Sequence, residues 1–176
     1  SHRLMRLYPD WHILHDGPYE SVYDALLASR QLSPEDLAVG PEGLHEPALL
    51  TDLTKAVERI HSAIRRRENI VIFGDYDVDG VTSTALFLDF LERVGARCDY
   101  ILPDRHSDGY GMKPPGVRRA VDKEAGLLIT VDNGISAFEG VEEAVKHGID
   151  VIVIDHHRQN EHLPPAHSIV NPNRQD

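Results

Sequence analysis

Residues 70–80 read IVIFGDYDVDG, and this stretch decides the fold. Its first half is a short apolar run rich in β-branched residues, a pattern that predicts a buried strand because the run is too short for a helix. Its second half places aspartates at alternate positions, Asp75, Asp77 and Asp79, and ends at Gly80. An apolar strand that ends in a polar loop is typical of a parallel sheet, in which ligands bind at the carboxyl ends of the strands.

Helical and strand patterns alternate on both sides of this stretch. Apolar residues spaced by three and four predict a helix over residues 50–67, with Thr51 or Asp52 as its expected N-cap. We then expect helices over 81–94, 116–123 and 136–147, and strands over 99–102, 127–131, 151–154 and 168–170. The alternation predicts an α/β fold: a parallel sheet of about five strands with helices on both faces.

Composition limits the class of protein. The chain has 176 residues, 41% of them hydrophobic, and a formal net charge of −11. No apolar run approaches the roughly 20 residues that a membrane span needs, so we expect no membrane segment. A single cysteine, Cys98, suits a reducing compartment and a cytoplasmic location. Prolines and glycines interrupt residues 1–48, which we expect to form an irregular leader with one short helix near 21–30, before a main domain over 49–176.

Three predicted strands end in chemically active residues. The first ends in the aspartate-rich loop, the second in Asp132-Asn133-Gly134, and the third in Asp155-His156-His157. A single aspartate after a strand is usually a helix cap or a turn residue, and Asn-Gly is an ordinary turn. Several carboxylates brought to one sheet edge repel each other unless cations or hydrogen bonds compensate. The sequence therefore predicts a cation site at this edge.

The type of cation follows from the ligands. Alternating aspartates followed by Gly80 also match the start of an EF-hand calcium loop, but Leu86 stands where that loop needs a bidentate glutamate. Carboxylates joined by imidazoles suit Mn²⁺ or Mg²⁺. Five aspartates carry more charge than one divalent ion balances, which favours two ions sharing a carboxylate. Such a pair is suited to phosphoester hydrolysis.

Other residues near this edge are weaker candidates for substrate contact. Ser83 and Thr84 fall in the first turn of the helix expected over 81–94, where free backbone N–H groups favour a phosphate, although helix capping explains each of them separately. Arg105 lies in a glycine-rich loop and is a candidate phosphate contact. Tyr110 in the same loop is a candidate for stacking on a base.

The motifs at 75–80, 131–135 and 155–157 resemble the first three motifs of the DHH phosphoesterase superfamily. With Arg105, the Gly-Tyr-Gly at 109–111 and the Val-Asn-Pro at 170–172, the wording is most similar to the RecJ family of bacterial single-strand-specific 5′→3′ DNA exonucleases. The resemblance covers roughly residues 46–176. It implies a catalytic domain with a five-stranded parallel sheet and two Mn²⁺ or Mg²⁺ ions.

The resemblance also implies roles for residues. Asp75 and Asp77 would bind one ion, Asp79 and His156 the other, and Asp132 would bridge both. The two remaining motif residues would be catalytic, with His157 facing the scissile phosphate and Asp155 orienting the histidines.

The same resemblance implies a substrate and partners. The chain would be the N-terminal catalytic part of an exonuclease of DNA repair and recombination, truncated before a fourth motif that supplies one more aspartate, and with little activity by itself. Single-stranded DNA would be the substrate, with a single-strand-binding protein or a helicase as possible partners.

Two alternatives remain open. One is a small-molecule phosphatase or dinucleotide phosphodiesterase on the same fold, but those relatives usually begin the first motif with a histidine rather than with Asp75. The other is a non-catalytic replisome scaffold, but such relatives tend to lose ligands that are all present here.

Overall fold

The computed structural model describes residues 17–38, 40–104 and 111–175. The chain divides into two compact units between His45 and Glu46. The first unit contains helix α2 (Val22–Arg30), the four-residue helix α3 (Pro34–Leu37) and the 3₁₀ turn η1 (Pro41–Gly43). The side chain of Ser21 accepts a hydrogen bond from the Asp24 N–H at the start of α2, so the expected helix near 21–30 is confirmed.

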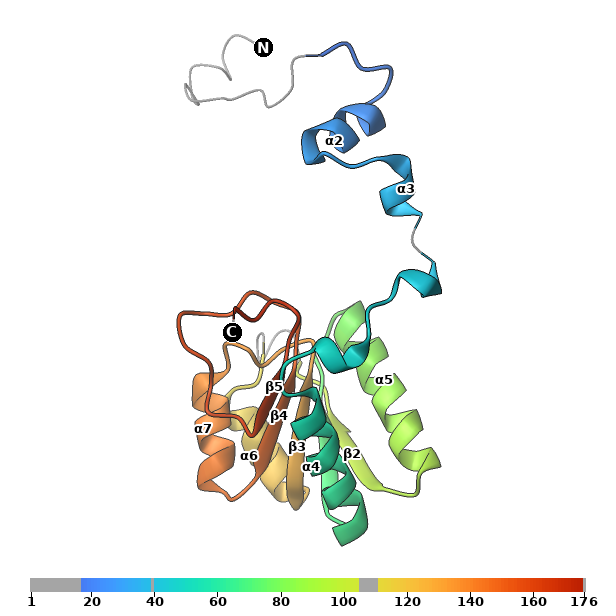
Figure 1. The fold of residues 1–176 in the computed structure, drawn as a ribbon. Coiled ribbons are helices and arrows are strands. Elements are labelled where there is room, and N and C mark those ends of the chain that lie inside the picture. The colour runs from blue at the N-terminus through green and yellow to red at the C-terminus, as the bar shows by residue number, and fades with distance from the viewer. Residues whose placement is uncertain (1–16, 39, 105–110, 176) are drawn as a thin grey trace, which may run out of the picture. The chain divides into compact units, whose positions relative to one another are not determined.

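The second unit alternates helices and strands (Figure 1). Its helical elements are η2 (Pro47–Leu49), α4 (Leu53–Arg66), α5 (Val78–Arg93), α6 (Pro114–Asp122) and α7 (Phe138–Lys146). Its strands are β1 (Asn69–Phe73), β2 (Arg97–Ile101), β3 (Ala125–Val131), β4 (Asp150–Ile154) and β5 (Ser168–Val170). Over the described ranges, no helix combines the length and the apolar character that crossing a membrane requires.

The five strands form one parallel sheet in the order β2-β1-β3-β4-β5. The predicted fold class is therefore confirmed. From β1 the chain first adds β2 on one side and then crosses to add β3, β4 and β5 on the other. The direction of winding thus changes between β1 and β3, which is where open parallel sheets bind their ligands.

Strands β1, β3 and β4 are apolar along most of their length because both faces of the sheet are covered there, whereas the edge strand β2 is polar and partly exposed. Val71 and Phe73 of β1 pack in a core with α6 and α7, whereas Ile70 and Ile72 of the same strand pack in a second core with α4 and α5. Figure 1 shows these helix pairs on opposite faces of the sheet. With no polar face available along the strands, the polar residues gather at their ends.

The starts of two helices differ from what the sequence predicts, although Asp52 is the N-cap residue of α4 as expected. Helix α5 begins at Val78, three residues earlier than expected, because the Asp77 carboxylate caps it by accepting from the Gly80 N–H at 3.0 Å. Asp52 stands at the start of α4, but its carboxylate does not bond the helix. It accepts instead from the Ile169 N–H at 3.1 Å and from Arg174 at 2.9 Å, which joins α4 to the segment around β5.

Arg59 holds together the edge of the sheet opposite the predicted site. Its guanidinium bonds Glu68 at 2.6 Å, Asp150 at 2.7 Å and the Gly126 carbonyl at 3.2 Å. These groups precede β1, begin β4 and belong to β3, so one side chain from α4 ties three strands.

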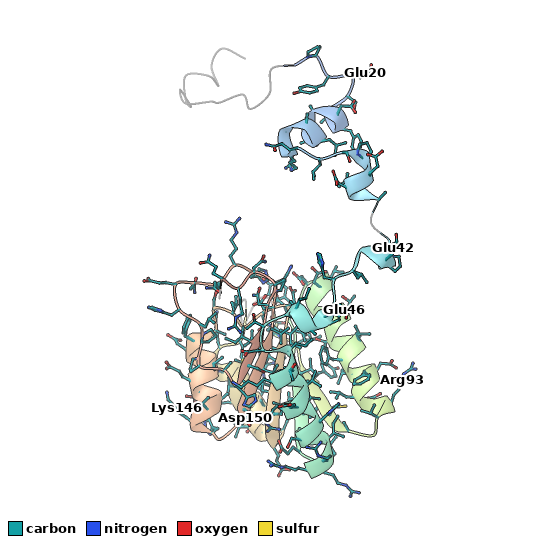
Figure 2. All side chains as sticks on the ribbon, in the orientation of Figure 1. Glu20, Glu42, Glu46, Arg93, Lys146 and Asp150 are labelled. Carbon is teal, nitrogen blue, oxygen red and sulfur yellow. The ribbon has the colours of Figure 1, made fainter. Side chains whose placement is uncertain are left out.

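We expect Arg59→Met to lower the free energy of unfolding by about 2–3 kcal/mol, because it removes a partly buried guanidinium that bonds both Glu68 and Asp150. The matched control is Arg93→Met (Figure 2 labels Arg93), which breaks an exposed pair with Asp89 and should cost less than about 1 kcal/mol. Urea unfolding of both variants checks this. Equal losses would show that burial of the Arg59 pairs contributes nothing.

Candidate metal centre

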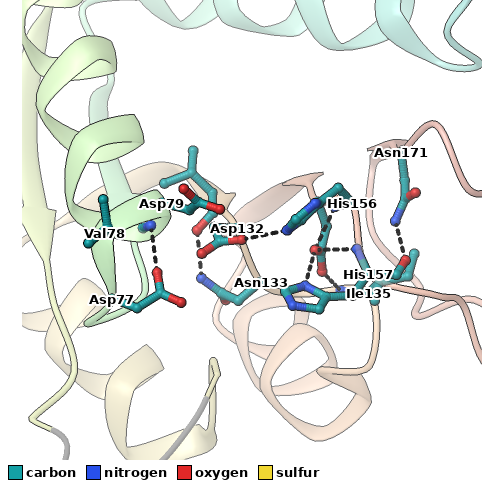
Figure 3. Close-up of polar contacts among 12 residues, drawn as sticks. Asp77, Val78, Asp79, Asp132, Asn133, Ile135, His156, His157 and Asn171 are labelled. Carbon is teal, nitrogen blue, oxygen red and sulfur yellow. Dashed lines mark hydrogen bonds and ion pairs between the residues drawn. The ribbon is translucent and has the colours of Figure 1, made fainter. Parts of the chain in front are cut away.

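The three predicted loops meet at the carboxyl edge of the sheet. One group of potential ligands contains a carboxylate oxygen from each of Asp75, Asp77 and Asp132, and these three atoms lie within 4.8 Å of one another. Asp132 forms a second such group with His156 and His157. Figure 3 shows Asp132 between the start of α5 and the histidines. Asp132 is thus common to two overlapping groups of potential metal ligands.

The two aspartates that follow β1 differ in environment. Asp75 is 1% exposed, and burial raises the pKa of its carboxyl group, with a further contribution from the negative charge of Asp77. Asp77 is exposed, and the hydrogen bond from the Gly80 N–H lowers the pKa of its carboxyl group. Asp77 is therefore a fixed anion that also starts the helix.

Asp132 has an unfavourable backbone and an unfavourable charge. Its φ is 61°, in the left-handed region, which is uncommon outside glycine. It is 8% exposed, and burial together with the neighbouring Asp77 raises the pKa of its carboxyl group to about 6. Its Oδ1 lies 3.0 Å from Nε2 of His156. Strain and repulsion of this kind concentrate at functional sites.

Asn133 fixes the turn that carries Asp132. It is fully buried, and its Nδ2 donates to the carbonyls of Phe73 at 3.1 Å and Val131 at 2.9 Å, so it links the ends of β1 and β3. Thr130 donates its hydroxyl proton to the Asn133 carbonyl at 2.8 Å. The sequence indicated only an ordinary Asn-Gly turn here. The signal that could have identified this link was the change in winding direction between β1 and β3, where the ends of neighbouring strands must be joined.

Asp155 organises the histidine loop. Its Oδ1 accepts from the His156 N–H at 2.7 Å, the His157 N–H at 3.0 Å and Nδ1 of His157 at 2.7 Å. Its Oδ2 accepts from the Ile135 N–H at 2.9 Å. Burial alone would lower the pKa of His157, but the hydrogen bond and charge of Asp155 outweigh it, and this pKa is raised. The carboxylate of Asp155 is thus occupied by the loop that it orients.

The substrate candidates separate into three cases. Ser83 lines a shallow pocket of about 260 Å³ together with Asp79, Asp132, Asp155 and His156. Thr84 is 3% exposed and donates its hydroxyl proton to the Gly80 carbonyl at 2.7 Å. The prediction that Ser83 and Thr84 lie in the first turn of this helix was wrong for both, because α5 begins at Val78, and neither caps it. Arg105 and Tyr110 lie outside the described residues.

A larger cavity of about 510 Å³ opens beside His157. It runs from Asp155 and His157 along the turn at Gly134 and Ile135 to the start of α7, with Met112 on its lining. The centre therefore has room for a substrate next to its histidines.

The donor set fits divalent cations. Carboxylate oxygens and one or two imidazole nitrogens suit Mn²⁺ and Mg²⁺, and no thiolate lies among the described ligand groups. Asp75 and Asp132, both buried and both with raised pKa values, would ionise more readily beside a cation. The residues present therefore fit a two-ion centre.

Burial of Asp132, together with the neighbouring Asp77, gives a pH-dependent prediction for the metal-free chain. Its pKa rises from 3.8 to about 6 on folding, so the folded state binds more protons between these values and loses stability as pH rises through them. We expect Asp132→Asn, which carries no charge, to be more stable than wild type by about 1–2 kcal/mol at pH 8. The difference should shrink below pH 5, where Asp132 is protonated. Urea unfolding with chelator at both pH values measures it, and a less stable variant at pH 8 would contradict the expectation.

Comparisons with known proteins identify the family of this chain. The "DHH family, N-terminal domain" profile matches residues 69–176. The chain is 45% identical over 143 residues to the single-stranded-DNA-specific exonuclease RecJ of Dickeya dadantii, covering 81% of this chain and 25% of that protein. It is 43% identical over 153 residues to RecJ of Escherichia coli, covering 86% of this chain and 26% of that protein. The chain thus spans about a quarter of the length of these relatives.

Solved structures give the same family. A crystal structure of exonuclease RecJ bound to manganese matches with a TM-score of 0.69 and 32% identity, covering 75% of this chain and 34% of that one. RecJ of Thermus thermophilus in complex with Mn²⁺ matches with a TM-score of 0.61 and 31% identity, covering 70% of this chain and 17% of that one. Together with the profile match over most of the main unit, these similarities show that the chain belongs to the DHH family.

Proposed function

We propose that this chain carries the catalytic centre of a single-strand-specific DNA exonuclease that hydrolyses phosphodiester bonds with two divalent ions. The observation that carries the proposal is the pair of overlapping ligand groups that share Asp132. A shared carboxylate is the arrangement that a two-ion phosphoesterase needs. The RecJ relatives, with names that specify single-stranded DNA and structures that hold manganese, support this substrate and Mn²⁺ as the metal.

The ligand assignment takes the first group whole and, from the second group, Asp132 and His156, while His157 is assigned to the substrate. Asp75, Asp77 and Asp132 would hold one ion, and Asp79, Asp132 and His156 would hold the other. Asp79 joins the second set because it lines the same pocket as Asp132 and His156. When bound, the two ions would activate a water molecule and stabilise negative charge on the phosphate.

The other residues act on the substrate. His157, held at Nδ1 by Asp155, would donate a hydrogen bond to a phosphate oxygen, and its raised pKa favours the protonated donor. Asp155 would keep the ring in place, as the carboxylate partner of a histidine commonly does. The cavity beside His157 has room for the nucleotide next to the scissile bond. Ser83 is positioned to contact a phosphate that reaches the second ion.

The wider setting is also part of the proposal. Processing of single-stranded DNA in repair and recombination would place the protein in the cytoplasm, with a single-strand-binding protein or a helicase as partner. Residues 1–48 would form a leader and 49–176 the DHH domain, in which the matched segment is residues 69–176.

Two measurements test the function. Calorimetric titration of this chain with Mn²⁺ should show binding, tighter than with Mg²⁺ because of the usual order of affinities. Hydrolysis is measured on a 5′-labelled single-stranded oligonucleotide and its duplex, for the chain itself and for a chimera in which it replaces the matched segment of E. coli RecJ.

We expect little activity from the chain alone and Mn²⁺-dependent degradation of the single strand by the chimera. No Mn²⁺ binding at millimolar metal would refute the metal centre. A chimera that hydrolyses a dinucleotide but not the oligonucleotide would instead support the small-molecule alternative.

A further inference from the structure

The histidine loop has no regular structure to support it. Helix α5 begins within the aspartate-rich loop that follows β1. Residues 155–167 between β4 and β5, by contrast, contain neither helix nor strand. The backbone carbonyls of His156 and His157 therefore have no helix or sheet partner. Carbonyl groups in such a segment need another hydrogen-bond donor if the loop is to keep one conformation.

Two asparagines after β5 supply the donors. Asn171 is 2% exposed, and its Nδ2 donates to the His157 carbonyl at 2.9 Å, a contact that Figure 3 shows. Nδ2 of Asn173 donates to the His156 carbonyl. The two asparagines also bond each other, because the Asn173 N–H donates to Oδ1 of Asn171 at 2.7 Å. Each histidine backbone is thus held by its own asparagine, and the asparagines are linked.

The neighbouring contacts extend this arrangement. The Asp155 N–H donates to the Val170 carbonyl at 3.1 Å, so the backbone pairing of β4 with β5 continues to the residue before the histidines. Pro172 lies between the asparagines, and its ring fixes its own φ and restricts Asn171 to extended conformations. Residues 170–173 therefore hold residues 155–157 first through a backbone contact and then through side chains, with Asn171 bonded to His157 and Asn173 to His156.

We propose that Asn171 and Asn173 are positioning residues that fix the backbone from which His156 and His157 reach the metal centre. Asp155, at the start of the loop, holds the imidazole of His157. The asparagines hold the backbone of the loop by donating hydrogen bonds to its carbonyls. Asp155 cannot do this, because a carboxylate only accepts hydrogen bonds. This inference rests on the proposed function in one respect: His156 must serve as a metal ligand if the two asparagines are to affect cation binding.

The test is Asn171→Asp in the 176-residue chain. Aspartate has nearly the same shape and still accepts from the Asn173 N–H, but it cannot donate to the His157 carbonyl. Its added negative charge would by itself favour cation binding. A loss of Mn²⁺ affinity therefore measures lost positioning, because the electrostatic effect has the opposite sign.

The matched control is Asn69→Asp. Nδ2 of Asn69 donates to the Lys123 carbonyl at 2.6 Å, at the opposite edge of the sheet, so this variant makes the same chemical change to the same type of contact. We expect Asn171→Asp to weaken Mn²⁺ binding at least tenfold in calorimetric titration, and Asn69→Asp to leave it within twofold of wild type. Equal Mn²⁺ affinity in wild type and Asn171→Asp would overturn the proposal.

A readout without metal separates this inference from the proposed function. In the metal-free chain, hydrogen exchange of the His156 and His157 amides should accelerate at least tenfold in Asn171→Asp, while the amides of β1 and β3 stay protected as in wild type. If the wild-type chain binds no Mn²⁺, the proposed metal centre is refuted, but the exchange rates still test whether Asn171 and Asn173 position the loop. Unchanged exchange at both histidines would overturn this inference.

Discussion

Asp132→Asn is expected to lower the rate of single-strand hydrolysis by about 10³-fold, equivalent to about 4 kcal/mol of transition-state stabilisation. Asp132 belongs to both ligand groups, so its loss weakens the binding of both ions together. The same substitution should stabilise the metal-free chain at pH 8, because it removes a buried charge that also repels Asp77. One residue would therefore lower stability in exchange for function.

Asp89→Asn is the control for this loss. Asp89 lies on α5 with an exposed side chain, and its substitution removes the same charge far from the ligand groups. Initial rates with the 5′-labelled oligonucleotide and excess Mn²⁺, measured in the chimera, compare the two variants. Asp132→Asn activity within tenfold of wild type would show that Asp132 does not bridge the ions.

Gly80→Ala should disrupt the first motif. A Cβ at position 80 would lie 2.5 Å from both the backbone nitrogen and the backbone oxygen of Asp75, and backbone atoms cannot move aside as a flexible side chain does. We expect a loss of about 2–3 kcal/mol in unfolding free energy, from overpacking, despite the better helix propensity of alanine. Because Asp75 must shift, Mn²⁺ affinity should fall at least tenfold as well.

Gly95→Ala provides the comparison. Gly95 has a φ of 73° and open space around its Cβ position, so alanine there costs only the backbone strain of about 1–2 kcal/mol. Urea unfolding and Mn²⁺ titration of both variants distinguish the effects. Gly95→Ala should bind Mn²⁺ like wild type, and a Gly80→Ala chain with wild-type affinity would show that Asp75 tolerates the displacement.

Three of the strands could be predicted from the sequence because burial alone determines their apolar composition. Strands β1, β3 and β4 are buried on both faces, so their apolar runs are nearly unbroken and end where the polar loops of the site begin. The start of α5 was harder to place, because Asp75, Asp77 and Asp79 are all plausible N-caps. Only the geometry of the loop selects Asp77, and the position of Thr84 depends on that choice.

The meeting of the three motifs at one sheet edge was predictable from the sequence, but the contacts that support their loops were not. Asn133 bonds Phe73, which lies 60 residues earlier, and Asn171 bonds His157, which lies 14 residues earlier. A local reading of asparagine gives only a turn, because these partners come close only after the sheet has formed. Contacts of this kind depend on the tertiary fold rather than on local propensity.

The strand order has a consequence for folding kinetics. The centre needs β1, β3 and β4 side by side, and each pairing joins segments that are distant in the sequence. Parallel pairing of distant segments is slow, and interactions absent from the folding transition state act on the unfolding rate. A complete ligand set exists only after this pairing, so cations act on the finished fold. Mn²⁺ should therefore lengthen the lifetime of the native state while leaving the rate at which it forms nearly unchanged.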